Sequence, residues 1–413
     1  MSSELRSRFP LLSSGIVAAA LLAAIYSEFG LGSYTRFTDL FRVEAKPYFV
    51  DLGVLLDGLA LFREGKSPYD SPTSPFNYPP SWQILSILPF LNQANLIVLG
   101  LALIAAFYGF SLWYLQKFGC PQWAAGLFLV SPPVLLLLDR GNCDIIVFLI
   151  LGLAAVFLRS EGAIVAAVFA ASMLKLFPVG ALSIWIRRFR GRIFDHRWKI
   201  LAVGAVFAAG FLLQWDGLRA VSERTPRPMH YMSYGLATLP SLVVERTNLG
   251  GLWSAGLYAL FYGGIAAFGL MLWTLTRQKP LRLPETSEQS KNLFLAGAGC
   301  FLVSNLIGFN WEYRLVFLLL ALPEVFALRA AHGLLFRVIL ASMLLLFYQT
   351  IIKRLLDGLM PLLPYKTNHF YFLADLNNIV LFYLMAFLVA KMLFPAKASA
   401  ATGEHCWRQR DMA

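Results

Sequence analysis

Apolar runs, many of them about 20 residues long, alternate with short polar segments along nearly the whole chain of 413 residues. Runs of this length can cross a bilayer core as helices, and they lack the period-two alternation of membrane barrel strands. Breaking the runs at polar and Gly/Pro clusters predicts about twelve crossings, which begin near residues 11, 80, 95, 122, 144, 161, 199, 252, 292, 314, 335 and 376. The pattern therefore predicts an all-α, polytopic integral membrane protein.

Two of the runs, 80–92 and 144–158, are shorter than the roughly 17 residues that a perpendicular helix needs. A partial or re-entrant helix at either place would reverse the side of the segments that follow. The first run, from Leu11 to about Gly30, lacks a convincing cleavage site and is interpreted as a retained helix. We expect one transmembrane domain over residues 1–394 and a polar cytoplasmic tail over 395–413.

Composition supports this class, with 58% hydrophobic residues, 14% charged residues and a mean hydropathy of +0.64. The net charge of +12 could indicate a nucleic-acid partner, but the basic residues cluster at helix ends, which is typical of topology signals. The densest cluster, 187–199, predicts a cytoplasmic loop, with both termini on the same side, in the inner (cell) membrane. The extracytoplasmic loops are then 31–79, 216–251 and 353–375.

The four cysteines, Cys120, Cys143, Cys300 and Cys406, are dispersed, with no CxxC pair and no His/Cys cluster at metal-ligand spacing. We expect no zinc site, no disulfide framework and no cofactor, although the sequence leaves metal dependence open.

The first outer loop holds the densest group of acids in the chain. Its segment 49–64 is apolar nearly all round and predicts a helix lying in or near the membrane interface. At 100° per residue, Asp51 shares a face with Gly58 while Asp57 points about 240° away, so the two carboxylates do not form a pair. Asp51 is either a general base, with room above it at Gly58, or the N-cap of this helix. Asp57 is interpreted as a surface acid.

Other polar residues of the outer loops are candidates for substrate binding. Tyr69, Asn77 and Tyr78 follow the interfacial helix and could contact a sugar or anchor the loop at the interface. His230, in the second outer loop, could bind an acceptor or pyrophosphate-like groups, or could be satisfied locally.

Several motifs together resemble glycosyltransferase family 87, whose members are polytopic enzymes of the GT-C superfamily. In the first loop these are D-L-x-V from Asp51, G-x-x-P-Y-D from Gly65, and F-x-Y-P-P from Phe76. Further along the chain they are RGNCD at 140–144, the K-x-x-P element Lys175-Leu176-Phe177-Pro178, and NWEYRLVFLLLALP at 310–323. The resemblance covers most of the chain up to about residue 325.

The resemblance implies that a hexose, most often mannose in the family, moves from a polyprenyl-phosphate donor to a hydroxyl of a lipid or glycan acceptor on the outer face, with inversion. Asp51 would be the base. The departing phosphate needs cations, and the candidates by position are Arg314, Arg140, Lys175 and Arg227. Trp311 and Glu312 would join Arg314 in substrate binding, with Trp311 and Arg314 at i and i+3 of a helix. Some members have a histidine in this region, where this chain has Glu312-Tyr313, so the chain departs from the family pattern here.

Three of the four cation candidates, Arg140, Lys175 and Arg314, also have a structural interpretation. The turn DRGNCD at 139–144, with Arg140, falls on the predicted inner side, opposite Asp51, where we expect a polar connection between helices. Lys175 could extend towards the cytoplasmic surface, and Glu312 and Arg314 could mark a membrane boundary.

Two other functions are compatible with the sequence. A transporter or lipid flippase would carry charges in pairs inside the membrane or at broken helices. A polymerase or ligase of lipid-linked saccharides would favour the arginines of loop 216–251. In each case the partners are membrane lipids and a lipid-linked or glycan substrate, with no nucleic acid.

Overall fold

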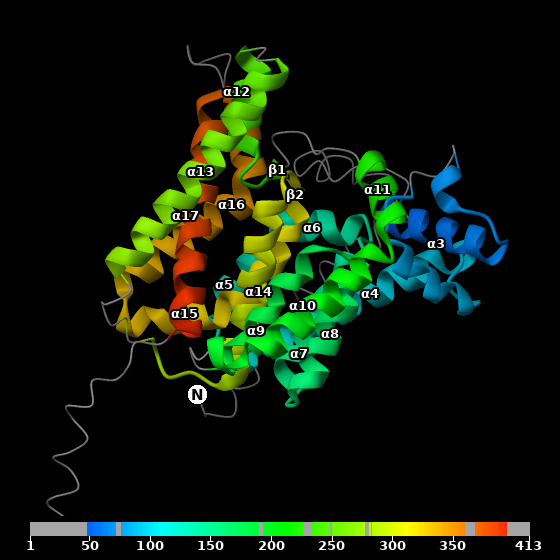
Figure 1. Cartoon of the computed structure of the whole chain (residues 1–413), viewed down its shortest axis with the longest axis horizontal. Coiled ribbons are helices and arrows are strands. Elements are labelled where there is room, and N and C mark those ends of the chain that lie inside the picture. Colours follow the sequence, from blue (N-terminus) through cyan, green and yellow to red (C-terminus); the bar gives the residue numbers. More distant parts are fainter. Residues whose placement is uncertain are drawn as a thin grey trace, which may run out of the picture.

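The protein is an assembly of helices with a single pair of two-residue strands in the described part of the chain, as the computed structural model in Figure 1 shows. The structure describes residues 48–71, 76–189, 193–225, 233–247, 250–276, 281, 283–359 and 368–394. The predicted first crossing from Leu11, the polar tail over 395–413, and the site candidates Arg227 and His230 lie outside the described residues.

The helices follow the apolar runs closely. The α-helices are α3 (Val50–Arg63), α4 (Leu96–Lys117), α5 (Gln122–Leu129), α6 (Pro132–Asp139), α7 (Asp144–Phe157), α8 (Glu161–Leu174), α9 (Ser183–Arg187), α10 (Arg197–Leu212), α11 (Trp215–Arg224), α12 (Thr238–Thr247), α13 (Gly251–Thr276), α14 (Glu288–Ile307), α15 (Leu322–Ala331), α16 (Gly333–Leu359) and α17 (Asn368–Leu393). The 3₁₀ helices are η1 (Pro68–Asp70), η2 (Pro80–Ile87), η3 (Gln93–Asn95), η4 (Phe177–Leu182), η5 (Ile193–His196) and η7 (Glu312–Ala321). Strands β1 (Ser233–Tyr234) and β2 (Asn310–Trp311) pair antiparallel.

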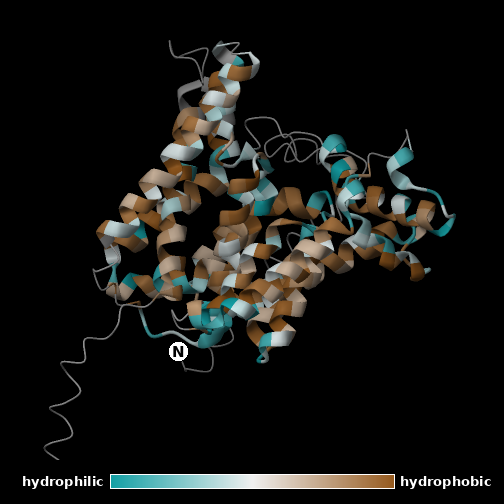
Figure 2. Ribbon diagram, in the orientation of Figure 1, coloured by the Kyte–Doolittle hydropathy of each residue, from teal (hydrophilic) through white to brown (hydrophobic). Residues whose placement is uncertain are grey.

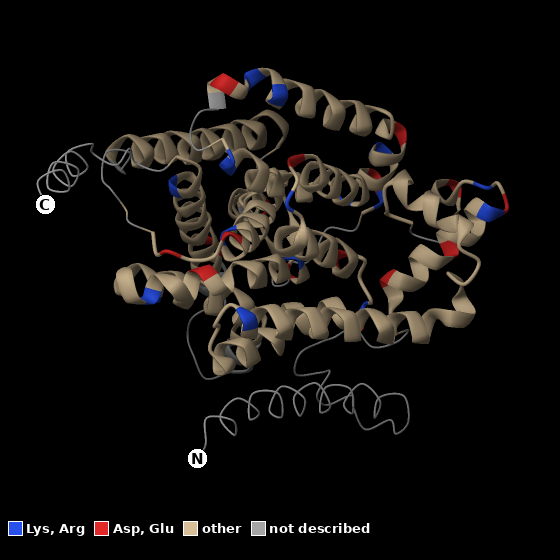
Figure 3. Ribbon diagram, turned by 90° about the horizontal axis from the view of Figure 1, so that it is seen from below, with Lys and Arg blue, Asp and Glu red and all other residues tan. Residues whose placement is uncertain are grey.

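Among the described residues, five helices are long and apolar enough to cross a membrane. Two bent pairs, α5 with α6 and α10 with α11, raise the number to seven if each pair is one span. Apolar residues cover most of these helices in Figure 2, and Figure 3 shows that most of the ribbon carries no charge. The predicted class, an all-α protein with several membrane-spanning helices, is confirmed at this level.

The crossing predicted near residue 80 is wrong. This segment forms η2, a 3₁₀ helix of 8 residues, which at about 2.0 Å per residue reaches only about 16 Å of the roughly 30 Å that a bilayer core requires. Prolines bound it, with Pro79 and Pro80 at its start and Pro89 just beyond its end, and a proline inside a helix would remove a backbone hydrogen bond. The segment therefore cannot act as a transmembrane helix.

The run predicted as one crossing from residue 161 reverses at Lys175. Helix α8 ends at Leu174, and the next segment, η4 followed by α9, runs back along α14. Three contacts define this antiparallel arrangement: Gly180 lies against Gly299, Ser183 Oγ donates to the Leu295 carbonyl at 3.0 Å, and Arg187 pairs with Glu288.

Helix α14 is the centre of the core, because η4 packs on one side of it and η7 on another. The close approach to η4 requires glycine on both sides: a Cβ at Gly180 would overlap the Gly299 carbonyl, and a Cβ at Gly299 would overlap the Gly180 carbonyl. Gly297 makes the equivalent approach to the backbone of Phe317 in η7. Small residues thus allow three backbone segments to pack closely, as is common between membrane helices.

The helix assembly has two chemically distinct ends. Arg187, Arg188 and Glu288 gather at one end, where Arg188 also donates to the Arg159 carbonyl at 2.6 Å. The opposite end of the same helices holds Asp144, at the start of α7, and Lys175, just after α8. The second end carries the candidate site.

Candidate functional site

The start of α3 is attached to the turn between α6 and α7. The N–H groups of Phe49 and Asp51 donate to the carbonyls of Asp139 and Arg140 at 2.9 and 3.0 Å. Phe49 adopts a left-handed conformation, with φ of 54°, and is the N-cap residue of α3. The interpretation of Asp51 as the N-cap is therefore wrong, since Asp51 lies inside the first turn.

The carboxylate of Asp51 binds this same turn. Arg140 donates two hydrogen bonds to it, from Nε to Oδ2 at 3.0 Å and from NH2 to Oδ1 at 2.6 Å. Asn142 Nδ2 also donates to Oδ2. Gly141, with φ of +56°, makes the turn, and a Cβ there would lie 3.1 Å from the side chain of Phe49. The prediction that DRGNCD lies on the side opposite Asp51 is wrong, because the segment around residue 80 does not cross.

The space above Gly58 is filled. A Cβ at Gly58 would overlap the ring of Phe76, so this glycine admits an aromatic side chain from the following loop. On the other side of α3, Asp57 accepts a hydrogen bond from Gln93 Nε2 at 2.7 Å. The helical separation of Asp51 from Asp57 agrees with the prediction that they do not form a pair.

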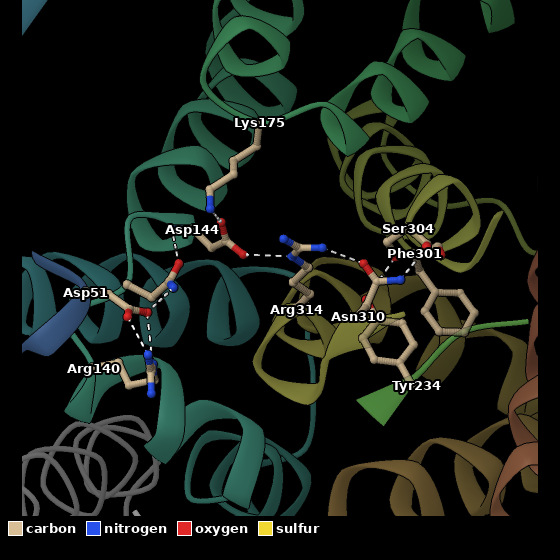
Figure 4. Close-up of polar contacts among 10 residues, drawn as sticks. Asp51, Arg140, Asp144, Lys175, Tyr234, Phe301, Ser304, Asn310 and Arg314 are labelled. Atoms are coloured by element: carbon tan, nitrogen blue, oxygen red, sulfur yellow. Dashed lines mark hydrogen bonds and ion pairs between the residues drawn. The ribbon is translucent and has the colours of Figure 1, made fainter. Parts of the chain in front are cut away.

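Asp144 is the residue that sequence reasoning missed as a site residue. Its side chain is fully buried, and its two oxygens lie 3.6 Å from Lys175 Nζ and 3.6 Å from Arg314 Nε (Figure 4). The signal in the sequence was an acid at the first position of a strongly apolar run, where a charge without a partner would be costly. Its partners lie 31 and 170 positions away in the chain.

Lys175 points into the site. Its ammonium lies 4.9 Å from the centre of the Tyr78 ring, in addition to its contact with Asp144. The alternative, in which Lys175 extends towards the arginine-rich segment 187–199, is wrong because the chain reverses at Lys175 and that segment lies at the other end of the helices. A cation between a carboxylate and an aromatic face is stabilised from both sides.

Arg314 is held by the strand pair and by η4. Its NH1 donates to Asn310 Oδ1 at 2.5 Å, and its guanidinium lies 5.2 Å from the ring centre of Phe177. Asn310 is itself fixed, since its Nδ2 donates to the carbonyls of Ser304 and Gly308. The polar contacts continue from Asp144 through Arg314 to these residues in Figure 4.

The structure separates Trp311, Glu312 and Arg314, which the sequence grouped together. Trp311 belongs to β2 and not to the helix, and its ring lies 5.5 Å from the guanidinium of Arg140. Glu312 is buried and accepts a hydrogen bond from Thr350 in α16. Trp311 therefore remains at the site, whereas Glu312 binds a neighbouring helix.

Tyr69 and Tyr78, which follow α3 in the chain, hold the backbone of the site in place through hydrogen bonds. Tyr78 donates to the Asp51 carbonyl at 2.9 Å, and Tyr69 donates to the Tyr78 carbonyl at 2.7 Å. Burial raises the pKa of Tyr69, so its phenol remains a hydrogen-bond donor even in moderately alkaline solution. Asn77 lies half-buried between Phe76 and Tyr78. These contacts indicate a scaffolding role for both tyrosines.

Three cations gather with two carboxylates at this site. Among the described residues, Arg140 pairs with Asp51, and Lys175 and Arg314 both lie beside Asp144. The side chains of Arg140, Lys175 and Arg314 are 15%, 12% and 18% exposed, and that of Asp51 is 13% exposed, whereas Asp144 has no exposed surface. The accessible part of the site thus favours an anion.

No group of three or more His, Cys, Asp or Glu side chains among the described residues could hold a metal ion. A scan against models of known protein families and a search of curated proteins find no match for this chain.

Proposed function

We propose that this protein is a GT-C-type membrane glycosyltransferase that moves a hexose, taken to be mannose from the family resemblance, from a polyprenyl-phosphate donor to a hydroxyl of a lipid or glycan acceptor. The observation that carries the proposal is the cluster of three cations, Arg140, Lys175 and Arg314, at one end of an apolar helix assembly. A phosphate linked to a lipid supplies both the anion that this cluster would bind and a tail soluble in the bilayer.

The phosphate would lie against Arg140, Lys175 and Arg314. Cations placed around a departing phosphate stabilise the charge that develops as the sugar–oxygen bond breaks. The phosphate leaves as an anion and needs no general acid, so one base that takes the proton of the acceptor hydroxyl is sufficient. A guanidinium carries five N–H donors, so Arg140, which binds Asp51, and Arg314, which binds Asn310, would bind the phosphate through their remaining N–H groups.

Asp51 is the base in this proposal. Of the two carboxylates in the site, only Asp51 has exposed surface, at 13% against 0% for Asp144. Arg140 and Asn142 fix its orientation. Inversion requires the acceptor hydroxyl, with Asp51 beside it, to attack the sugar carbon from the side opposite the phosphate. Because Arg140 binds Asp51 directly, the phosphate would lie nearest to Lys175 and Arg314.

The proposed orientation places the site on the extracytoplasmic face. The orientation follows from the two opposite ends of the helices, because Arg188 binds the Arg159 carbonyl before α8 begins, whereas Lys175 follows the last residue of α8. The arginine-rich end at 187–199 is then cytoplasmic by the positive-inside rule. Asp51 and Arg140 lie at the other end, where polyprenyl-phosphate sugars serve as donors in enzymes of this type.

A transporter or lipid flippase is the second candidate, and one observation favours it. Asp144 forms buried ion pairs with Lys175 and Arg314 inside an apolar assembly, as charges on a substrate pathway often do. The structure offers less support for a polymerase or ligase of lipid-linked saccharides, because Arg219, one of the arginines of segment 216–251, pairs with Glu223 on the exposed surface of α11.

The test is transfer in proteoliposomes supplied with radiolabelled polyprenyl-phosphate sugars, with the labelled product identified by mass. We expect Asp51→Asn to abolish transfer without lowering the folded yield. Asp57→Asn is the matched control, since Asp57 lies on another face of the same helix, and it should keep its activity. Retained transfer in Asp51→Asn would reject Asp51 as the base. Absence of transfer from every donor, together with movement of the labelled lipid across the bilayer, would favour the transporter.

A further inference from the structure

Asp144 occupies an unusual position for a buried acid. Both of its oxygens are fully buried and accept no hydrogen bond from the described residues. Its partners are two cations at 3.6 Å, longer than the roughly 2.7–2.9 Å of a charge-assisted hydrogen bond. A carboxylate that served only to neutralise a buried cation would be expected to approach it more closely.

The two cations are correspondingly left with capacity for another anion. The side chains of Lys175 and Arg314 keep 12% and 18% of their surface exposed, so a second anion can still reach both cations. Lys175 and Arg314 would also repel one another without the carboxylate between them, since like charges close together in a medium of low dielectric constant are costly. Asp144 therefore holds both cations in place without saturating them.

Asp144 is itself fixed from the direction of Asp51. Its backbone N–H donates to Asn142 Oδ1 at 2.9 Å, and Asn142 Nδ2 donates to the Asp51 carboxylate. One amide side chain thus links the two carboxylates of the site. Having no exposed surface, Asp144 cannot touch a substrate directly and acts only through its neighbours.

We propose that Asp144 is a positioning residue that sets how tightly the phosphate is held and how fast it is released. This inference rests on the proposed function, because it assumes that Lys175 and Arg314 face a phosphate. Asp144 orients Lys175 and Arg314 towards the phosphate from the buried side of the site. Its negative charge also weakens the attraction between these two cations and the phosphate. The spent polyprenyl phosphate can then leave after the sugar has been transferred.

The first experiment measures binding of farnesyl phosphate, a short polyprenyl monophosphate, to the full-length detergent-solubilised protein, with farnesol as the probe that lacks the phosphate. Asp144→Asn removes the competing charge and should bind farnesyl phosphate about tenfold more tightly, which corresponds to about 1.4 kcal/mol. Binding of farnesol should not change. In the transfer assay the same variant should show a lower KM, a lower kcat and stronger inhibition by added farnesyl phosphate.

Two further variants distinguish positioning from a merely structural role. Glu324→Gln is the control for removing a buried acid, because Glu324 accepts hydrogen bonds from Thr286 and Ser290 at the other end of the protein. It should leave the affinity for farnesyl phosphate unchanged. The double variant Asp144→Asn/Lys175→Gln, called the balanced variant, has the same net charge at the site as the wild type. Its affinity for farnesyl phosphate should return towards that of the wild type. If Asp144→Asn alone folds poorly, this balanced variant should recover the folded yield.

The outcomes separate this inference from the proposed function. Wild-type protein that binds farnesyl phosphate no better than farnesol would overturn both. Wild-type protein that prefers farnesyl phosphate, combined with equal or weaker binding by Asp144→Asn, would overturn only the role of Asp144. A failure of the balanced variant to recover either affinity or yield would also contradict it.

Discussion

The pair formed by Asp51 and Arg140 should be strongly coupled, and a double-mutant cycle measures this directly. The cycle compares Asp51→Ala, Arg140→Ala and the double variant. Asn142 also donates to Asp51, but it is present in all four proteins, so its contribution largely cancels. The coupling energy therefore reports on the two charged side chains.

The geometry sets the expected magnitude. Two unit charges about 4 Å apart attract by about 4 kcal/mol at an effective dielectric constant of about 20. The side chains are 15% and 13% exposed, so solvent screens part of this attraction, while two parallel hydrogen bonds at 2.6 and 3.0 Å strengthen it. We expect a coupling energy of roughly 2–3 kcal/mol, within the range found for close, largely buried charge pairs.

The assay is reversible unfolding of the detergent-solubilised protein by added SDS, followed by circular dichroism. The pair Arg219–Glu223 in α11 is the matched control, because its side chains are 73% and 65% exposed and its members lie at i and i+4. Its coupling should be below about 0.5 kcal/mol. An equally small value for Asp51 and Arg140 would refute the conclusion that this pair joins α3 to the α6–α7 turn.

Two other predictions concern packing and support of the site. Gly180→Ala should sharply lower the yield of monodisperse protein on gel filtration, because its Cβ would overlap the Gly299 carbonyl. Gly204→Ala is the control and should keep the yield, because no atom lies within 4 Å of its Cβ position. An equal yield for both variants would contradict the close packing of η4 on α14. Tyr69→Phe should destabilise the protein by about 1 kcal/mol through the lost hydrogen bond to the Tyr78 carbonyl. Because burial raises the pKa of Tyr69, this loss should be the same at about pH 6 and about pH 9 in SDS unfolding, and a loss that disappears at the higher pH would show that the phenol ionises.

Much of the secondary structure follows from apolar run length. The interfacial helix predicted over 49–64 is α3, Val50–Arg63, and the long runs near 95, 252, 292, 335 and 376 are all helices. The segment at 80 was misjudged because hydropathy reports apolar content but not rise per residue or the effect of flanking prolines. The reversal at Lys175 was missed for a related reason, since the apolar run continues through it.

The site was only partly predictable. Asp51, Arg140, Lys175 and Arg314 were all candidates, and the structure brings them together, but their pairing joins residues 89 and 170 positions apart. Periodicity carries no information on such distances. Asp144 is assigned to a polar turn because its neighbours in the chain do not reveal its partners. Glu312 is assigned to the site because it stands beside Arg314 in the NWEYR motif, and this position in the chain does not show that its side chain turns towards α16.

Three of the 3₁₀ helices begin beside the site: η2 two residues after Tyr78, η4 two residues after Lys175, and η7 at Glu312, just before Arg314. A 3₁₀ helix rises about 2.0 Å per residue against about 1.5 Å for an α-helix, so the 10 residues of η7 span about 20 Å and would span about 15 Å as α-helix. The difference is close to one full α-helical turn. Arg314 is the third residue of η7, so its separation from α15 depends on the winding of the rest of this segment. A change of winding there would move Arg314 relative to Asp144 without replacing any residue.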